Sequence, residues 1–158
     1  MPSSQQFEIF ADYFQFVLMD ETSDDDFSEI WSKAALVRML AVGDKALCPG
    51  TLRNIDVDVQ INIVEQKPVI AHNDFDHIAE ASINIPSGKL VVMGCSGYLP
   101  DAPRIDVVPG VYEALFAVSG INTITDEAES AEDKYTVYLW PGQQREPELI
   151  KHWENNSA

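Results

Sequence analysis

The sequence predicts a mainly β fold: an antiparallel β-sandwich of about seven or eight strands, with one α-helix in the N-terminal third. Three observations support this class. Several segments alternate apolar and polar residues with a period of two, which is typical of strands with one buried face. Glycine and proline separate these segments at short intervals, and short connections suit antiparallel rather than parallel strands. A single segment carries its apolar residues at helical spacing.

The N-terminal third should contain one long strand, the helix and a short strand. FEIFADYFQFVLM (7–19) is rich in aromatic and branched residues and predicts a long strand that is bent or bulged. SEIWSKAALVRMLA (28–41) predicts the helix, because four apolar residues form one stripe: Ile30, Ala34, Val37 and Ala41. Ser23 or Ser28 would cap its start. KALCPGT (45–51) is a candidate for the short strand.

The clearest strand pattern is IDVDVQINIVE (55–65), in which branched apolar residues alternate with polar ones. Asp56 and Asp58 belong to its polar face. FDHIAEASINI (75–85) repeats the alternation and places His77 on the apolar face. Pro86-Ser87-Gly88 then predicts a tight turn, and KLVVMGCS (89–96) returns, so we expect these two segments to pair as an antiparallel hairpin.

The remaining strands are RIDVV (104–108), VYEALFAVSG (111–120) and KYTVYLW (134–140), and the acidic loop INTITDEAESAEDK precedes and overlaps the last of them. We expect residues 1–144 to form a single β-sandwich domain. Residues 145–158 should form a C-terminal tail, with a short helix around Leu149 to Trp153 followed by disordered residues.

The strongest functional signal is charge. Ten basic residues face 26 acidic ones, which gives a formal net charge of −16. Solubility alone needs a magnitude of about 2 to 8 in a small domain. An acidic surface repels nucleic acid and anionic membranes and attracts basic proteins. We therefore expect a basic protein partner and no direct contact with nucleic acid or membrane.

The compartment is predicted to be the cytoplasm. The start MPSSQQFEIF shows no secretory signal, and Cys48 and Cys95 have no C-x-x-C spacing. Sequence motifs of enzymes are absent: there is no G-x-S-x-G, P-loop, G-x-G-x-x-G or H-E-x-x-H pattern. We expect no catalytic residues and no cofactor.

The stretch HNDFDH (72–77) raises the question of a metal site, because imidazole and carboxylate are metal ligands. In a strand that begins at residue 75, Asp76 and His77 point to opposite faces and cannot bind one ion together. His72, Asp74 and Asp76 would need a further ligand from elsewhere, so we expect no metal here. If residues 72–76 form a loop, His72 and Asp74 could still meet a cation with help from another loop.

Two acidic runs have alternative interpretations. DETSDDDFSE (20–29) is either the charged start of the helix or part of a calcium site built from loops, although no register fits the EF-hand loop. TDEAESAEDK (125–134) is either a solvated loop or an acidic arm for a basic partner.

Four segments resemble, in order and spacing, the competence protein J family, which is typified by the inhibitor of the DNA-entry nuclease: LRNIDVDVQINI, DHIAEASINIPSGKLVVMGC, VPGVYEALFAVSGINT and YTVYLWPG. The resemblance covers roughly residues 7 to 142 and lies in strand and turn patterns, which support the fold better than the function. It implies an intracellular protein that binds and blocks a nuclease.

The charge fits this implication independently, because a nuclease that grips phosphates exposes a basic groove. We expect a non-enzymatic acidic protein that inhibits a nuclease, or neutralises a basic toxin as an immunity protein, by mimicking nucleic-acid charge. The candidate contacts are ten carboxylates: Asp24, Asp25, Asp26, Asp56, Asp58, Asp126, Glu127, Glu129, Glu132 and Asp133. The alternative is a β-sandwich module that binds calcium or a small ligand.

Overall fold

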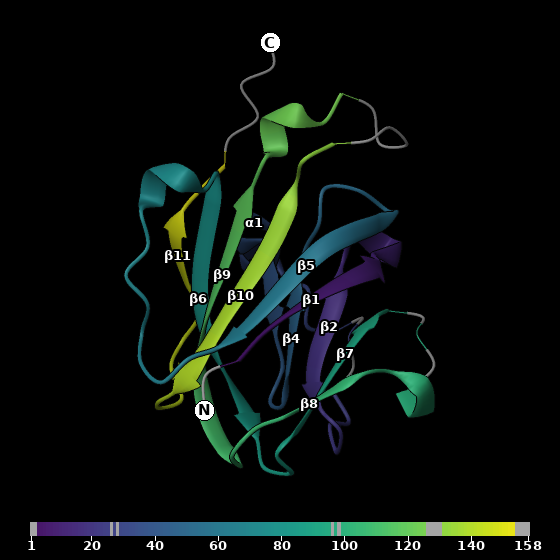
Figure 1. Cartoon of the computed structure of the whole chain (residues 1–158), viewed down its shortest axis with the longest axis vertical. Coiled ribbons are helices and arrows are strands. Elements are labelled where there is room, and N and C mark those ends of the chain that lie inside the picture. The colour runs from purple at the N-terminus through teal and green to yellow at the C-terminus, as the bar shows by residue number, and fades with distance from the viewer. Residues whose placement is uncertain are drawn as a thin grey trace.

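Two β-sheets pack face to face in the computed structural model, which describes residues 3–25, 27, 29–95, 97, 99–125 and 131–153 (Figure 1). The six-stranded sheet contains, in spatial order, β1 (Ser3–Phe10), β5 (Asp56–Ile63), β10 (Lys134–Pro141), β9 (Gly110–Ser119), β6 (His77–Ile85) and β11 (Glu148–Lys151). The five-stranded sheet contains β3 (Leu40–Val42), β4 (Ala46–Pro49), β2 (Phe16–Asp20), β7 (Lys89–Gly94) and β8 (Arg104–Asp106). The helix α1 (Lys33–Arg38) precedes β3, and four short 3-10 turns complete the described elements: η1 (Asp12–Phe14), η2 (His72–Asp74), η3 (Leu99–Asp101) and η4 (Ile121–Thr123).

The core fills the space between the sheets. On β5 the apolar residues are buried while Asp56 and Asp58 are exposed, as the alternation predicts. Phe16 on β2 meets Phe116 on β9 edge to face, with ring centroids 6.3 Å apart. Tyr135 on β10 stacks on Phe116 at 6.4 Å, so aromatic rings join the two sheets.

The prediction of a mainly β, two-sheet fold with one helix is confirmed. The described residues form eleven strands rather than seven or eight. One pairing is parallel, because β10 runs alongside β5 with Lys134 next to Asp58. About 70 residues separate these two strands, which is ample for the crossover that a parallel pair requires.

The predicted hairpin of residues 75–85 and 89–96 is wrong. β6 pairs with β9 and β11, whereas β7 belongs to the other sheet and pairs with β2 and β8. The turn between them therefore crosses from sheet to sheet, with Gly88 at a φ of +73°. The carboxylate of Asp20 accepts hydrogen bonds from the backbone N (3.0 Å) and the hydroxyl (2.7 Å) of Ser87, which ties this turn to the end of β2.

The predicted long strand of residues 7–19 is two strands in different sheets. The chain leaves β1 at Phe10, turns through η1 and enters β2 at Phe16. Tyr13 and Phe14 both adopt a φ of 59°, which turns the chain from one sheet toward the other. The expected bend is real, but it is sharp enough to end one strand and begin another.

The helix is shorter than predicted, and its predicted stripe is wrong. Ala35 is the buried residue of α1, whereas Ala34 and Val37 are exposed. Ser32 caps the start by accepting a hydrogen bond from the backbone N of Ala35 at 3.1 Å, rather than Ser23; Ser28 lies outside the described residues. The helix ends at Arg38 because the following residues pair as β3 with β4, so strand pairing overrides the helical spacing.

The predicted helix around Leu149 to Trp153 is also wrong where the chain is described. Glu148–Lys151 forms β11, in which Leu149 lies opposite Ala79 of β6. The free edge of β6 offers backbone donors and acceptors, and the tail satisfies them by adding a strand. The predicted disordered end lies mostly outside the described residues. No helix within the described ranges is long and apolar enough to span a membrane.

Candidate functional site

One end of the molecule gathers η1 and the starts of two strands. β5 runs antiparallel to β1 and parallel to β10, so β5 and β10 begin where β1 ends. The backbone N of Ala11 donates to the carbonyl of Ile55 at 2.9 Å, which fixes η1 next to the start of β5. Figure 1 shows β1 ending and β5 beginning on the same side of the molecule. We call this region the η1 end.

Acidic side chains line the outer face of the sheet at the η1 end. Glu8, Asp56 and Asp58 are all exposed, and Glu8 lies directly opposite Asp58 in the β1–β5 register. Glu132 is exposed as well and lies two residues before Lys134, the neighbour of Asp58 on β10. We call Glu8, Asp56, Asp58 and Glu132 the acidic edge. Like charges opposite each other on a sheet are destabilising, although Lys134 on the other side of Asp58 offsets part of the repulsion between Glu8 and Asp58.

Asp133 is a structural residue rather than a surface one. It is 1% exposed, and its carboxylate meets Nη2 of Arg53 at 2.5 Å and Nε at 3.2 Å. The hydroxyl of Tyr135 donates to Asp133 at 2.9 Å and accepts from the backbone N of Leu52 at 3.0 Å. Burial raises the pKa of Tyr135, so it remains a donor. This network closes the η1 end, and its carboxylate does not face a partner.

Asp25 has a structural role at the opposite end of the molecule. Its carboxylate accepts hydrogen bonds from the backbone N of Asp44 (2.8 Å) and Lys45 (3.0 Å) and from the hydroxyl of Ser23 (2.6 Å). Burial raises the pKa of Asp25, but these hydrogen bonds and the charge of Lys45 outweigh burial and lower it overall. The residue therefore holds the β3–β4 turn, while its neighbour Asp24 is exposed.

The ten predicted contacts therefore do not form one patch. Asp56, Asp58 and Glu132 come together at the η1 end, and Asp24 lies with Asp25 at the other end. Four of the predicted residues lie outside the described residues: Asp26, Asp126, Glu127 and Glu129. The sequence did not single out Glu8, whose place opposite Asp58 depends on a pairing between distant strands.

The η1 end also carries an apolar groove that sequence reasoning missed. The groove has a volume of about 360 Å³ and lies between η1, α1 and the residues after β4. Tyr13, Phe14 and Leu36 line it and are 73%, 46% and 64% exposed. In the sequence, the alternation of residues 7–19 breaks at ADYF (11–14), and this break indicates that the strand is interrupted there. Its aromatic residues were assigned to a strand because they are typical strand formers.

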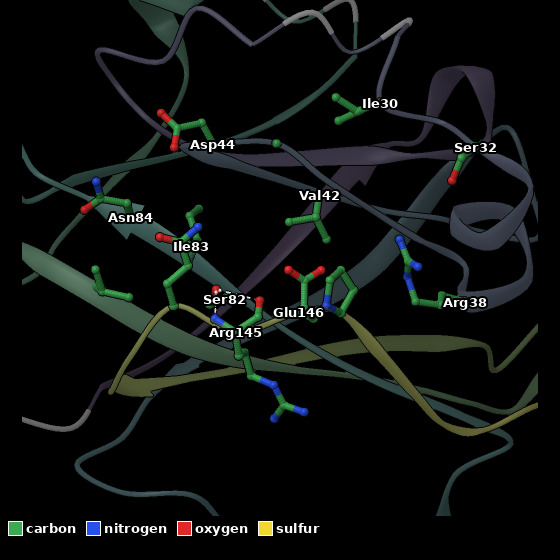
Figure 2. A pocket seen from close by; sticks show the side chains of 14 residues that line it. Ile30, Ser32, Arg38, Val42, Asp44, Ser82, Ile83, Asn84, Arg145 and Glu146 are labelled. Atoms are coloured by element: carbon green, nitrogen blue, oxygen red, sulfur yellow. Dashed lines mark hydrogen bonds between the residues drawn. The ribbon is translucent and has the colours of Figure 1, made fainter.

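A second hollow of about 340 Å³ lies between the β3–β4 turn, β6 and the segment before β11 (Figure 2). Figure 2 shows Arg38 and Asp44 on opposite sides of it. The hydroxyl of Ser82 accepts from the backbone N of Arg145 at 3.0 Å, and the Arg145 guanidinium donates to Glu80 at 2.6 Å and to Glu148 at 3.2 Å. The contacts of Ser82 and Arg145 hold the segment before β11 against β6, so these two residues stabilise the fold.

The HNDFDH stretch forms η2 and the start of β6. His72 and Asp74 are exposed, and Asp76 accepts a hydrogen bond from the backbone N of Ile121 at 3.0 Å. His77 is buried, as predicted, and both ring nitrogens are used. Nδ1 accepts from the backbone N of Trp153 at 3.1 Å, so Nε2 donates to the carbonyl of Arg38 at 2.5 Å. Within the described ranges, no three His, Cys, Asp or Glu side chains are grouped to hold a metal ion.

The chemistry of Cys48 is that of a core residue. Its side chain is buried, and burial raises the pKa of the thiol to about 12. The thiolate is the nucleophilic form, so Cys48 is unreactive at neutral pH. Cys48 and Cys95 are both free thiols.

Comparison with known proteins gives matches in structure but not in sequence. No family model and no curated protein sequence matches the chain. The fold matches ComJ, the inhibitor of the DNA-degrading activity of NucA from Bacillus subtilis, with a TM-score of 0.70 and 15% identity over 90% of this chain and 99% of that one. It also matches a crocagin biosynthetic protein J, with a TM-score of 0.62 and 16% identity over the same shares. The chain has the ComJ fold.

Proposed function

We propose that this chain is a non-enzymatic inhibitor that binds a nuclease, or neutralises another basic toxin, in the cytoplasm. The observation that carries the proposal is the shared fold, because ComJ inhibits a nuclease and 90% of this chain superposes on it. At this level of identity the likeness concerns the fold, so the argument for function rests on the surface as well.

The acidic edge supports the proposal by its charge and position. Glu8, Asp56, Asp58 and Glu132 are exposed on one end of a molecule whose net charge is −16. A nuclease binds phosphates with a basic groove, and an opposing acidic surface accelerates encounter with such a groove. The proposed mechanism is occlusion: the carboxylates occupy the positions of phosphates and exclude DNA.

The direct test mixes the purified chain with nucleases encoded beside it and follows the degradation of DNA. We expect inhibition that saturates with the chain and weakens as salt rises, because exposed charges are screened beyond roughly 8 Å at 0.15 M. Full nuclease activity at saturating chain, for every such nuclease, would disprove the proposal.

Two variants that remove equal charge locate the surface. Glu8→Gln, Asp56→Asn and Asp58→Asn together neutralise part of the acidic edge. Asp24→Asn, Asp44→Asn and Glu65→Gln neutralise three exposed carboxylates that lie away from the η1 end. The first variant should lower the association rate constant at low salt by roughly tenfold and flatten its salt dependence. The second should do much less; equal effects would show that net charge matters and the edge does not.

A further inference from the structure

The apolar groove is a feature that charge does not explain. Seven large apolar side chains are exposed among the described residues, and five of them lie on the last residue of β1, on η1 and on α1: Phe10, Tyr13, Phe14, Leu36 and Val37. Three of the five, Tyr13, Phe14 and Leu36, line the groove. Exposed apolar patches mark interaction sites, and aromatic residues are enriched at the centres of protein interfaces. The groove is therefore a candidate binding site.

The groove is held rigid by its floor. The backbone N of Gly50 donates to the carbonyl of Met39 at 2.7 Å, and the backbone N of Thr51 donates to the carbonyl of Phe14 at 2.8 Å. Consecutive floor residues thus bind both walls, one at α1 and one at η1. The shape exists before a partner arrives, which lowers the entropic cost of binding.

Both walls contain residues in an uncommon backbone conformation. Tyr13, Phe14 and Met39 are the non-glycine residues with positive φ in the described part of the chain, with φ of 59°, 59° and 58°. All three line the groove. Met39 is the C-cap of α1, where a left-handed residue commonly ends a helix. At Tyr13 and Phe14 the conformation is costly for a residue with a Cβ, and such residues cluster at binding sites, where the surrounding structure imposes them.

Several polar groups of the groove are bonded within the chain. The side-chain oxygen of Gln15 accepts from Nε1 of Trp31 at 2.9 Å, and the hydroxyl of Thr51 donates to the carbonyl of Arg53 at 2.8 Å. The backbone N of Leu52 donates to Tyr135. The surface that remains is mostly apolar, with the exposed side chains of Tyr13, Phe14 and Leu36, so the groove suits an apolar side chain better than a polar small molecule.

The acidic edge lies close enough to share one interface with the groove. Leu52 in the groove floor and Asp56 in the acidic edge are four residues apart, so their Cα atoms are at most about 14 Å apart. A standard interface covers roughly 800 Å² on each partner, which is about 30 Å across. The two surfaces face different ways, because Glu8 and Asp58 point outward from the six-stranded sheet whereas Ala35 of α1 packs against the five-stranded sheet. A partner that wraps around the η1 end covers both.

We infer that the groove is the anchor subsite for a basic protein, and that it receives one large apolar side chain flanked on the partner by lysines or arginines. This inference rests on the proposed function and adds a division of roles. The acidic edge steers association, and the groove slows dissociation, because buried apolar anchors at the centre of an interface carry most of the binding energy.

The test compares two double variants in binding to the purified nuclease that is encoded beside the chain. Tyr13→Asn with Leu36→Gln removes two groove side chains, and asparagine tolerates the positive φ at position 13. Val69→Gln with Val108→Gln removes two exposed apolar side chains elsewhere, which are 102% and 74% exposed. Melting temperatures of all proteins show that the fold is kept.

We expect the groove variant to weaken nuclease binding at least tenfold, mainly through faster dissociation and with an unchanged salt dependence. The control variant should bind as the wild type does. Equal affinity of groove variant and wild type would overturn the inference while the proposed function stands. The inference would also be overturned if the wild type is a dimer and the groove variant is a monomer that still binds the nuclease, since the groove would then join two copies. A wild type that binds no nuclease overturns both.

Discussion

Replacing Asp133 by asparagine tests whether this acidic residue belongs to the fold or to the binding surface. Asp133 forms an ion pair with Arg53, and both residues are almost fully buried, with 5% of Arg53 and 1% of Asp133 exposed. Removing one member of a buried ion pair costs about 3–5 kcal/mol, because the remaining charge keeps its desolvation penalty. For a chain of this size, each kcal/mol lowers the melting temperature by roughly 2–4 °C. Asp133→Asn should therefore lower it by roughly 6–20 °C.

The control is the adjacent residue. Glu132 is exposed, so Glu132→Gln should change the free energy of unfolding by less than about 0.5 kcal/mol. Urea unfolding of both variants, together with Arg53→Met and the double variant, gives the coupling between Arg53 and Asp133, which should exceed roughly 1 kcal/mol. The reasoning is refuted if Asp133→Asn is as stable as Glu132→Gln, or if the coupling is zero. Below its melting temperature, Asp133→Asn should still inhibit the nuclease.

Two further predictions concern the dependence of stability on pH. Burial lowers the pKa of His77, with a smaller contribution from His152, so the unfolded chain binds the proton more readily. The stability that depends on neutral His77 is complete above pH 6.5 and falls as the pH drops below it, by at most about 1.4 kcal/mol per pH unit. Urea unfolding between pH 5 and 7 should show this slope, and His77→Gln should flatten it; equal slopes would contradict the assignment. For Asp20, burial raises the pKa, but hydrogen bonds from Thr22 and Ser87 lower it overall. Asp20→Asn should cost about 1–3 kcal/mol at pH 7. The difference should shrink as the pH falls below 3.8, because there the unfolded chain takes up a proton on Asp20 before the folded chain does. A constant difference would contradict the role of the Asp20 carboxylate.

Local patterns in the sequence predicted the strands but not how they assemble. The alternation in residues 55–63 and 77–85 depends on neighbours along the chain. β5 shows the alternation in its burial, and β6 forms the predicted strand but is buried on both faces. Pairing depends on contacts across the chain, so the same alternation did not distinguish a hairpin from a turn that joins two sheets. The helix was overestimated for the same reason, because residues 40–42 gain more from pairing with β4 than from extending α1.

The candidate site divides in the same way. Asp56 and Asp58 were predictable because a period of two exposes them. Asp133 was misjudged because an acidic run does not reveal that one of its carboxylates meets Arg53, which lies 80 residues earlier. The groove requires η1, α1 and the residues after β4 to converge, which no local pattern states.

Removing carboxylates from the acidic edge should affect stability and binding differently. Glu8 faces Asp58 across β1 and β5, and such a pair of like charges costs roughly 0.2–1 kcal/mol, part of which Lys134 on β10 offsets. The variant Glu8→Gln, Asp56→Asn, Asp58→Asn removes both the repulsion and the attraction to Lys134, so it should melt within about 4 °C of the wild type, while it binds the nuclease more slowly. A residue kept at a cost to the free chain is expected where the partner supplies the opposite charge. If the variant instead melts well below the wild type, these carboxylates stabilise the fold, and the case for the acidic edge as a binding surface fails.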